Sequence, residues 1–324
     1  MPLLSANAVL RAAARISPLV KRTRVLRSHG LSRLSAADVR LKLENEQLTG
    51  SYKVRGAMNV IGSLDPAARM RGVVASSAGN HGLGVAYAAK HFGVRATIFI
   101  PASAPRVKRD GIVALGATVD ETQPHYDAAM VKAKAFAAAE GSTFVNPCLG
   151  DDLLAGQGTV ALEILAECPG MHTLVVSVGG GGLLGGCASL IREHAPSVRI
   201  VGVQSENTAA MSRSMAADTL VEIMNLPTLA DGLAGQIDED ALSIGRAGLD
   251  DIFTVTEAEI GAGMLWLLDH HGLTVEGAGA VGVASILAGR LKPVGETVVI
   301  ISGGNVDPAR LTSLRRAAGM SVKT

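Results

Sequence analysis

The chain has 324 residues, 48% of them hydrophobic and 18% charged, which predicts a large buried core in about two domains and excludes disorder. Its 30 lysine and arginine residues nearly balance 29 acidic residues, which argues against nucleic acid or a membrane as partner and favours a small molecule. The three cysteines, Cys148, Cys168 and Cys187, fit neither a zinc motif nor a disulfide set, which indicates a reducing, cytoplasmic location.

The first 37 residues contain seven lysines and arginines and no acidic residue. An organelle transit peptide has this composition. The stretch SANAVLRAAARI also fits a surface helix that begins at Ser5 or Asn7 and turns its arginines to solvent. We favour the helix.

Apolar, β-branched runs alternate with alanine-rich helical segments along the rest of the chain. The expected strands are GVVASS, ATIFIP, TLVVSV, RIVGVQ and TVVIIS. Short buried strands with helices between them predict parallel βαβ units and an open, doubly wound α/β fold. Ligands of such sheets bind where strand ends turn into helix N-termini, so a site is expected at these turns.

One uncharged run, from Thr173 to Ile191, is about long enough to span a bilayer. Its six glycines cluster in the middle, however, which a membrane helix does not require. We interpret the run as a strand, a loop and the start of a helix.

Lys53, in the stretch TGSYKVRGA, is a candidate catalytic group, although most lysines are simply solvated. The turn SSAGNHG, residues 76–82, follows an expected strand and brings backbone N–H groups and polar side chains to a helix N-terminus. Such a turn binds an anion or merely caps the helix.

Two further turns add to this candidate site. The turn VGGGG, residues 178–182, lets the backbone wrap a phosphate with no side chain in the way. The turn SGGNVD, residues 302–307, places the Ser302 hydroxyl at the end of the last strand. A lysine, an anion nest, a glycine cradle and a strand-end serine are together what a lysine-bound phosphorylated aldehyde cofactor requires.

An alternative of another class uses the same glycine loop. Gly180, Gly182 and Gly185 spell G-x-G-x-x-G, and Glu206 ends the next strand. This pattern would make the protein an oxidoreductase that binds NAD on the loop, with Lys53 unrelated to the cofactor.

The chain resembles the fold-type II pyridoxal-phosphate enzymes, specifically the group of threonine/serine dehydratases and serine racemases. The resemblance extends from about Ile16 to Asp307 and rests on ordered motifs: KLENEQLTGSYKVRGA, SSAGNHGLGVAYAA, SVGGGGLLGG, TLADGLA, VEGAGAVGVA and SGGNVD. It implies a tryptophan synthase β-like fold and a homodimer. The implied domains are a large cofactor-binding domain, residues 1–71 and 148–324, and a small mobile domain, residues 72–147.

The resemblance also implies the role of each site residue. Lys53 would hold pyridoxal 5′-phosphate as a Schiff base, with Tyr52, where the family usually has phenylalanine, packed on its ring. Asn80 would bind the ring 3′-oxygen, Ser302 would face the pyridine nitrogen, and Glu276 would lie near the ring edge. The phosphate would be held by Gly179, Gly180, Gly181 and Gly182. The substrate turn would comprise Ser76, Ser77, Ala78, Gly79 and His81, with Ser77 also catalytic.

The implied reaction is β-elimination from a β-hydroxy amino acid. The freed Lys53 amine would remove the α-proton, the β-hydroxyl would leave, and the product would hydrolyse to a 2-oxo acid and ammonia. A neutral hydroxyl at Ser302 would leave the pyridine nitrogen unprotonated, which favours prompt elimination. Racemases of the group carry a serine where this chain has Ala78, so we favour a dehydratase over a racemase. Serine, threonine and 3-hydroxyaspartate all stay open as substrates.

The resemblance finally suggests a site for a divalent cation, magnesium, calcium or manganese. The carboxylate of Glu206 and the carbonyl of Ala210 would be two of its ligands. Ser212 occupies the third, usually acidic position and is a poorer ligand for a hard cation. The alternative is that Glu206 is a solvated residue at a strand end.

Overall fold

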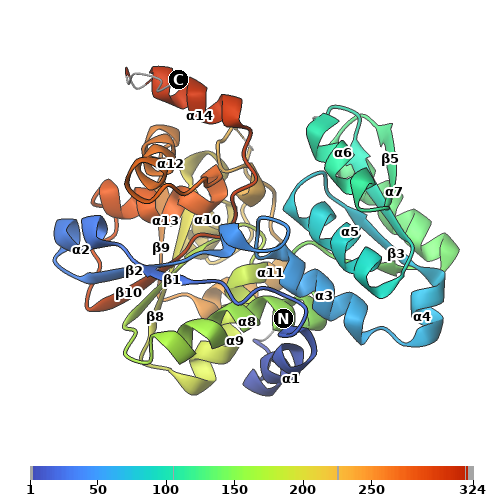
Figure 1. Cartoon of the computed structure of the whole chain (residues 1–324), viewed down its shortest axis with the longest axis horizontal. Coiled ribbons are helices and arrows are strands. Elements are labelled where there is room, and N and C mark those ends of the chain that lie inside the picture. The colour runs from blue at the N-terminus through green and yellow to red at the C-terminus, as the bar shows by residue number, and fades with distance from the viewer. Residues whose placement is uncertain (1–2, 105, 225, 318, 320–324) are drawn as a thin grey trace.

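Two separate sheets organise the chain (Figure 1). The computed structural model describes residues 3–104, 106–224, 226–317 and 319. The larger sheet has six strands in the order β1-β2-β10-β7-β8-β9. Only the edge strand β1 runs antiparallel to its neighbour. In this order the strands are β1 (Val25–Arg27), β2 (Asp38–Lys42), β10 (Glu296–Ile300), β7 (Thr173–Ser177), β8 (Arg199–Ser205) and β9 (Asp251–Val255).

The smaller sheet has four parallel strands and is built from one continuous part of the chain. Its strands, in spatial order, are β5 (Thr118–Gln123), β4 (Ala96–Pro101), β3 (Val73–Ser76) and β6 (Thr143–Phe144). The predicted α/β fold with open parallel sheets is confirmed. The five expected strands are β3, β4, β7, β8 and β10.

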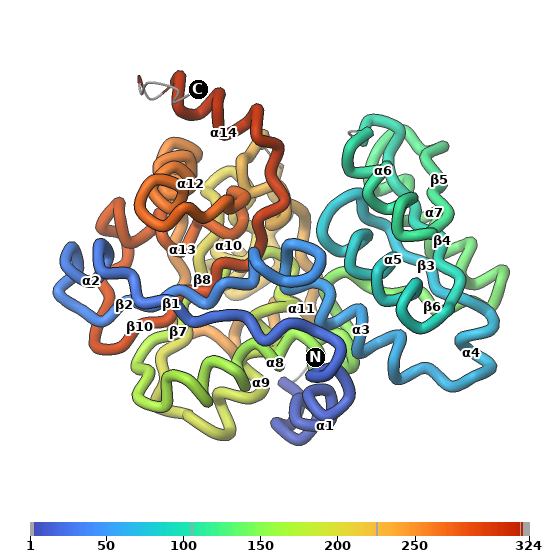
Figure 2. Tube along the Cα trace, in the orientation of Figure 1, coloured from blue at the N-terminus to red at the C-terminus, as the bar shows by residue number. Residues whose placement is uncertain are grey.

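Helices cover both faces of each sheet, as the Cα trace also shows (Figure 2). Before the small sheet lie α1 (Ala6–Ile16), α2 (His29–Ser35), α3 (Lys53–Ser63) and α4 (Pro66–Arg71). Within it lie α5 (Asn80–Phe92), α6 (Arg106–Ala114) and α7 (Tyr126–Glu140). After it come α8 (Asp151–Glu167), α9 (Gly182–His194), α10 (Ala210–Ala217), α11 (Glu239–Gly248), α12 (Glu257–His271), α13 (Gly277–Leu287) and α14 (Pro308–Ala317). Short 3-10 helices are η1 (Glu44–Glu46), η2 (Glu206–Thr208) and η3 (Asp231–Leu233).

The period of two along β7 explains why both faces are covered. Leu174 and Val176 pack in the core that contains residues of α8 and α9. Val175 points the other way, into the core that contains residues of α13. Since successive strand residues face opposite sides, a strand with successive apolar residues at its centre needs helices on both sides.

Helices α8 and α9 approach each other through glycine. A Cβ atom added to Gly158 would lie only 2.5 Å from the carbonyl oxygen of Gly186. The two backbones therefore touch without a side chain between them, which a larger residue at either position would prevent.

Two local predictions are also settled by the elements. The expected N-terminal helix is α1, which buries Val9 and Ile16 and leaves Arg11 and Arg15 exposed. The run Thr173 to Ile191 is strand β7, the glycine turn and most of α9. Among the residues described, no helix has the length and apolar character needed to cross a bilayer.

Candidate active site

Lys53 is the first residue of α3 and lies half-buried. Its Nζ donates a hydrogen bond of 2.6 Å to the carbonyl oxygen of Pro147 and lies 5.4 Å from the centre of the Tyr52 ring. Burial alone would lower the pKa of Lys53, but the Tyr52 hydroxyl and the Cys148 thiol raise it above its ordinary value. The structure thus holds a charged amine away from bulk water.

Ser302 pairs with the segment that leads into this lysine. The backbone N–H of Tyr52 donates to the Ser302 carbonyl oxygen at 3.1 Å, and Ser51 pairs with Gly303 as an isolated β-bridge. The Ser302 side chain is buried two residues beyond the end of β10, and its hydroxyl donates a long bond of 3.4 Å to the Ala278 carbonyl. The backbone of Ser302 is therefore joined to the residue that precedes the candidate lysine, while its neutral hydroxyl faces Ala278.

The turn that precedes α5 reaches from the small sheet to the large one. Asn80 Nδ2 donates to Glu276 Oε1 at 2.7 Å, and Asn305 Nδ2 donates to Asn80 Oδ1 at 2.6 Å. Within the turn, the N–H of Gly79 donates to the Ser77 hydroxyl. Ser76 is fully buried at the end of β3, and its hydroxyl has no partner in the structure. Helix α5 also packs against the start of α3, because a Cβ on Gly84 would lie 3.2 Å from the Lys53 carbonyl oxygen.

Glu276 precedes α13, but its side chain does not cap that helix. It is buried and accepts from Asn80 instead. Burial, with help from the Asp231 carboxylate, raises the pKa of Glu276 to about 7, against the opposing effect of the Asn80 hydrogen bond. This carboxyl group consequently changes charge near neutral pH.

His81 contributes differently from what the sequence suggested. Its ring is buried, and Nε2 donates to the Val145 carbonyl oxygen at 2.9 Å, which assigns the proton to that nitrogen. Burial and the nearby Lys53 lower the pKa of His81 to about 3, so the ring is neutral. Because the side chain is committed to Val145, only the backbone N–H of His81 is left for a substrate carboxylate.

The glycine loop between β7 and α9 has no room for side chains. A Cβ on Gly180 would lie 2.6 Å from the Cys148 sulfur, and one on Gly182 would lie 2.9 Å from the Cys148 carbonyl oxygen. A Cβ on Gly179 would lie 3.0 Å from the Cα of Leu233, and Gly181 has a φ of +85°. The loop thus presents bare backbone at the N-terminus of a 13-residue helix, a geometry that suits a phosphate group; we call it the glycine cradle.

Contacts connect these parts into one site. Cys148 packs against the loop, and its neighbour Pro147 accepts the Lys53 bond, so the lysine and the cradle share one wall. Lys53 is tied to Ser302 through Tyr52, and Gly303 lies against Glu276. The structure therefore brings together the predicted lysine, serine, asparagine, glutamate and glycines.

Three residues of this site were not predicted from the sequence. Pro147 and Cys148 come from the segment that returns from the small sheet, and Asn305 from the turn after β10. A cysteine in a loop carries no recognisable signal, because its contact with the glycines is made only in the folded chain. Asn305 lies within the motif SGGNVD, which was the one available sign.

The predicted cation site is not supported. Glu206 is exposed at the start of η2, and the Ser212 backbone donates to the side chain of Gln204. The nearby Glu257 carboxylate accepts from the hydroxyls of Ser205 and Thr228, so protein donors already satisfy it. Within the described ranges, no three histidine, cysteine, aspartate or glutamate side chains are grouped to hold a metal ion.

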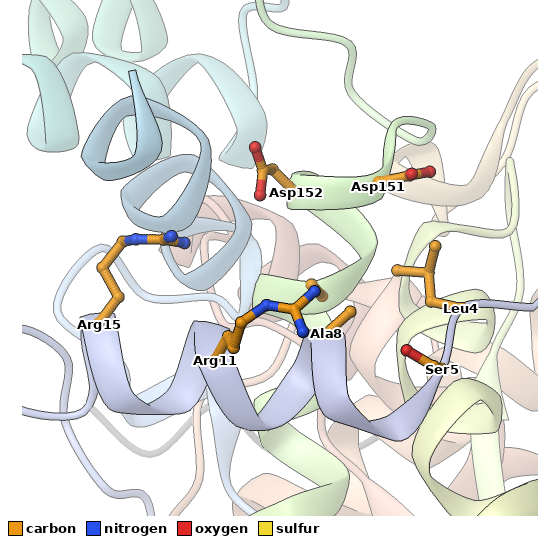
Figure 3. Close-up of a pocket in the computed structure, with 8 residues that line it drawn as sticks. Leu4, Ser5, Ala8, Arg11, Arg15, Asp151 and Asp152 are labelled. Carbon is orange, nitrogen blue, oxygen red and sulfur yellow. The ribbon is translucent and has the colours of Figure 1, made fainter. Parts of the chain in front are cut away.

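A cavity of about 290 Å³ lies away from these residues, between α1 and the start of α8 (Figure 3). Arg11 and Arg15 line it from α1, and Asp151 and Asp152 from α8. None of the predicted site residues contributes to its wall. It is therefore a separate feature of the surface.

A doubly wound α/β fold with a half-buried lysine and a bare glycine loop that share one wall is the arrangement that an enzyme with a lysine-bound phosphorylated aldehyde requires. Residues 16–303 match the family model described as pyridoxal-phosphate dependent enzyme, and the chain belongs to this family.

Relatives and solved structures narrow the comparison. The chain is 41% identical over 291 residues to an L-threonine ammonia-lyase of Thermotoga maritima, covering 89% of this chain and 72% of the relative. It is 37% identical over 318 residues to a catabolic L-threonine dehydratase of Staphylococcus aureus, covering 96% and 92%. Its fold is similar to that of maize serine racemase, with a TM-score of 0.92, 30% identity and 98% of each chain covered. The predicted fold type II is thereby confirmed.

This family membership does not support the NAD alternative. Gly185, the last glycine of G-x-G-x-x-G, lies inside α9, where a Cβ would meet Ile244 and Leu154 at 3.2 Å. Close helix packing explains this glycine without a dinucleotide.

Proposed function

We propose that the protein is a pyridoxal-phosphate-dependent ammonia-lyase that removes water and ammonia from a β-hydroxy amino acid such as threonine or serine. The product is the corresponding 2-oxo acid. The observation that carries the proposal is the position of Lys53, which is joined to Ser302 through Tyr52 and to the wall of the glycine cradle through Pro147. The names of the Thermotoga and Staphylococcus relatives support it.

The residues present fit the cofactor. The backbone N–H groups of residues 179–182 would hold its phosphate, Tyr52 would pack on its ring, and Asn80 and Ser302 would bind the polar atoms of the ring. When bound, pyridoxal phosphate draws electrons from the α-carbon of an amino acid and makes the α-proton acidic.

The chain's own groups then have distinct tasks. The Nζ of Lys53 accepts the α-proton as a neutral amine. The Ser77 hydroxyl and the N–H groups at the start of α5 bind the substrate carboxylate, because a helix N-terminus favours an anion. Ser302, as a neutral hydroxyl, does not add a positive charge to the ring, which favours departure of the β-hydroxyl over a long-lived carbanion.

Three wider features belong to this proposal. Residues 72–147, with the small sheet, form a mobile domain that closes over the substrate and excludes water. The working unit is a homodimer, and it acts in the cytoplasm.

Racemisation of serine is the second candidate function, and the likeness to maize serine racemase favours it. Ala78 argues against it. A racemase must return a proton to the face of the α-carbon opposite Lys53, and a methyl group has no proton to give. Dehydration of 3-hydroxyaspartate is a third reading of the same site.

The test starts with purified protein and four amino acids: threonine, L-serine, D-serine and 3-hydroxyaspartate. We expect release of ammonia and a 2-oxo acid, and a visible Schiff-base absorption band that disappears in Lys53→Ala. Lys90→Ala, which alters an exposed lysine at the end of α5, is the matched control. It should keep both the release of the 2-oxo acid with ammonia and the absorption band. A colourless protein whose binding quenches or enhances nicotinamide fluorescence would refute the proposal, and interconversion of serine enantiomers faster than keto-acid release would favour the racemase.

A further inference from the structure

Four charged residues are enclosed beneath the site and pair with one another. The side chains of Arg55, Glu44 and Lys42 are fully buried, and that of Glu163 is 16% exposed. Arg55 Nε and Nη2 each donate to Glu44 at 2.8 Å, and Nη1 and Nη2 donate to Glu163 at 2.8 and 3.0 Å. Lys42 Nζ donates to Glu163 at 2.6 Å. We call these four residues the buried quartet.

The buried quartet ties together elements that are distant in sequence. Lys42 ends β2, Glu44 starts η1, Arg55 lies in the first turn of α3, and Glu163 lies on α8. Burial alone would raise the pKa of Glu44, but Arg55 holds it below its ordinary value, so this carboxylate stays charged. Two cations and two anions leave the set neutral.

Such a set is poorly explained by stability alone, because removing charges from water offsets much of the attraction between them. The geometry of the buried quartet, by contrast, allows the Arg55 guanidinium only one position. Arg55 also donates to the Thr159 hydroxyl and to the Lys21 carbonyl, both at 3.2 Å, so its guanidinium is fixed on all sides. A planar fork that is held this way fixes the helix turn that carries it.

That turn also carries Lys53. Two residues along an α-helix differ by about 200°, so Lys53 and Arg55 point to opposite sides of α3. Arg55 points into the buried quartet, while Lys53 reaches Pro147 at the site. On the same side as Arg55, α8 presses on the helix, since a Cβ on Gly156 would lie 2.7 Å from the Arg55 carbonyl oxygen.

We infer that Arg55 is a positioning residue for Lys53: bound to Glu44 and Glu163, it fixes the first turn of α3 and hence where the lysine amine lies. The inference rests on the proposed function, since it assigns Lys53 as the cofactor-bearing group. It adds a role for side chains that touch neither cofactor nor substrate.

The test measures Lys53 itself, in the protein freed of cofactor. Pyridoxal phosphate is added, the Schiff base is reduced with borohydride, and mass spectrometry measures the label at each lysine over time. In Glu44→Gln and Arg55→Lys we expect labelling of Lys53 to slow about tenfold, as displacement of a reacting group by a fraction of an ångström does. We expect kcat to fall by a similar factor, with KM changed much less. Thr159→Val removes one hydrogen bond to Arg55 and no charge, so it should slow the labelling of Lys53 and lower kcat by a smaller factor. This variant keeps the inference testable if a charge variant does not fold.

Arg192→Gln is the control, because it breaks the 2.7 Å ion pair with Asp250 away from α3. It should lower the melting temperature without slowing the labelling of Lys53. Normal labelling and kcat in the folded quartet variants would overturn the inference, as would equal losses in Arg192→Gln. If the wild-type protein is not labelled at Lys53 and forms no 2-oxo acid, the proposed function itself fails, and this inference with it.

Discussion

Asn80 and Glu276 are 196 positions apart in the chain, yet the Asn80 amide donates to the Glu276 carboxylate at 2.7 Å. Asn80 starts the helix after β3 of the small sheet, and Glu276 precedes a helix that packs on the large sheet. Asn305 holds the other end of the same amide. Both hydrogen-bonding ends of Asn80 are therefore set by residues in turns beside the large sheet.

The first prediction concerns Glu276 and pH. Its pKa is about 7 in the folded chain against an ordinary value of 4.5, so the folded state holds this proton to higher pH than the unfolded state. The associated stability is complete below the unfolded pKa and is lost as pH rises through about 7, by about 3 kcal/mol. Glu276→Gln still accepts the Asn80 bond and cannot ionise. We expect urea unfolding of the cofactor-free variant to lose less stability than the wild type from about pH 5 to about pH 8.

Glu206→Gln is the control for this measurement, because Glu206 is exposed and its substitution should leave the wild-type pH dependence unchanged. Equal losses of stability in wild type and Glu276→Gln would show that Glu276 does not titrate in this range.

The second prediction concerns the glycine cradle. Gly180→Ala would place a methyl group 2.6 Å from the Cys148 sulfur and push the loop from its wall. We expect the affinity for pyridoxal phosphate to fall at least about tenfold, which corresponds to about 1.4 kcal/mol. Fluorescence titration of the cofactor-free protein measures it. Gly170→Ala, whose nearest neighbour is the flexible end of Glu296 at 3.3 Å, should bind normally; unchanged affinity in Gly180→Ala would mean that the loop does not hold the phosphate.

The third prediction concerns Ala78. Ala78→Ser introduces a hydroxyl in the turn before α5, where it can return a proton to the α-carbon. We expect the variant to convert L-serine into D-serine at a measurable rate while keto-acid release continues. Chiral chromatography of the unreacted serine is the assay, with Ala67→Ser, at an exposed position of α4, as control. If Ala78→Ser forms no more D-serine than the control, the residue at this position does not decide between elimination and racemisation.

The fourth prediction concerns the ion pair that joins α6, beside the small sheet, to η3, beside the large sheet. Lys108 on α6 and Asp231 in η3 lie 3.0 Å apart, and η3 also packs against the cradle through Leu233. Since the pair is partly exposed, Lys108→Asp or Asp231→Lys should raise KM only about twofold to fivefold, and less at high salt. The double charge swap should restore KM. Additive losses in the double variant would show that the two side chains act independently and do not hold the small sheet's helices closed.

Much of the fold follows from local sequence pattern. The centre of the run TLVVS is continuously apolar and β-branched or aliphatic, with no charged residue at either end, and this predicts a strand covered on both faces. The lysine, the glycine loop and Ser302 were also predictable, because a bare cradle and a strand-end hydroxyl follow from residue type and place in the chain.

The sequence could not show what the folded chain brings to these residues. Nothing around Cys148 indicates that it forms the wall of the glycine loop, and nothing at Pro147 indicates a bond to Lys53. His81 is predicted to bind the substrate, and which part of it is free to do so depends on tertiary structure, because the ring is buried and bonded to Val145. The predicted cation site at Glu206 is unsupported for a similar reason, since the Glu257 carboxylate accepts bonds from the hydroxyls of Ser205 and Thr228, which the sequence does not reveal.

The contact between Gly158 and Gly186 limits how this protein can be engineered for heat tolerance. Replacing helical glycines with alanine is a common way to stabilise a protein, because alanine narrows the unfolded ensemble. Here both glycines lie inside helices, and the added methyl group would strike the facing backbone, which cannot move aside like a flexible side chain. At these two positions the substitution would therefore lower the free energy of unfolding instead of raising it. Glycine-to-alanine substitutions meant to stabilise the protein should be made in other helices.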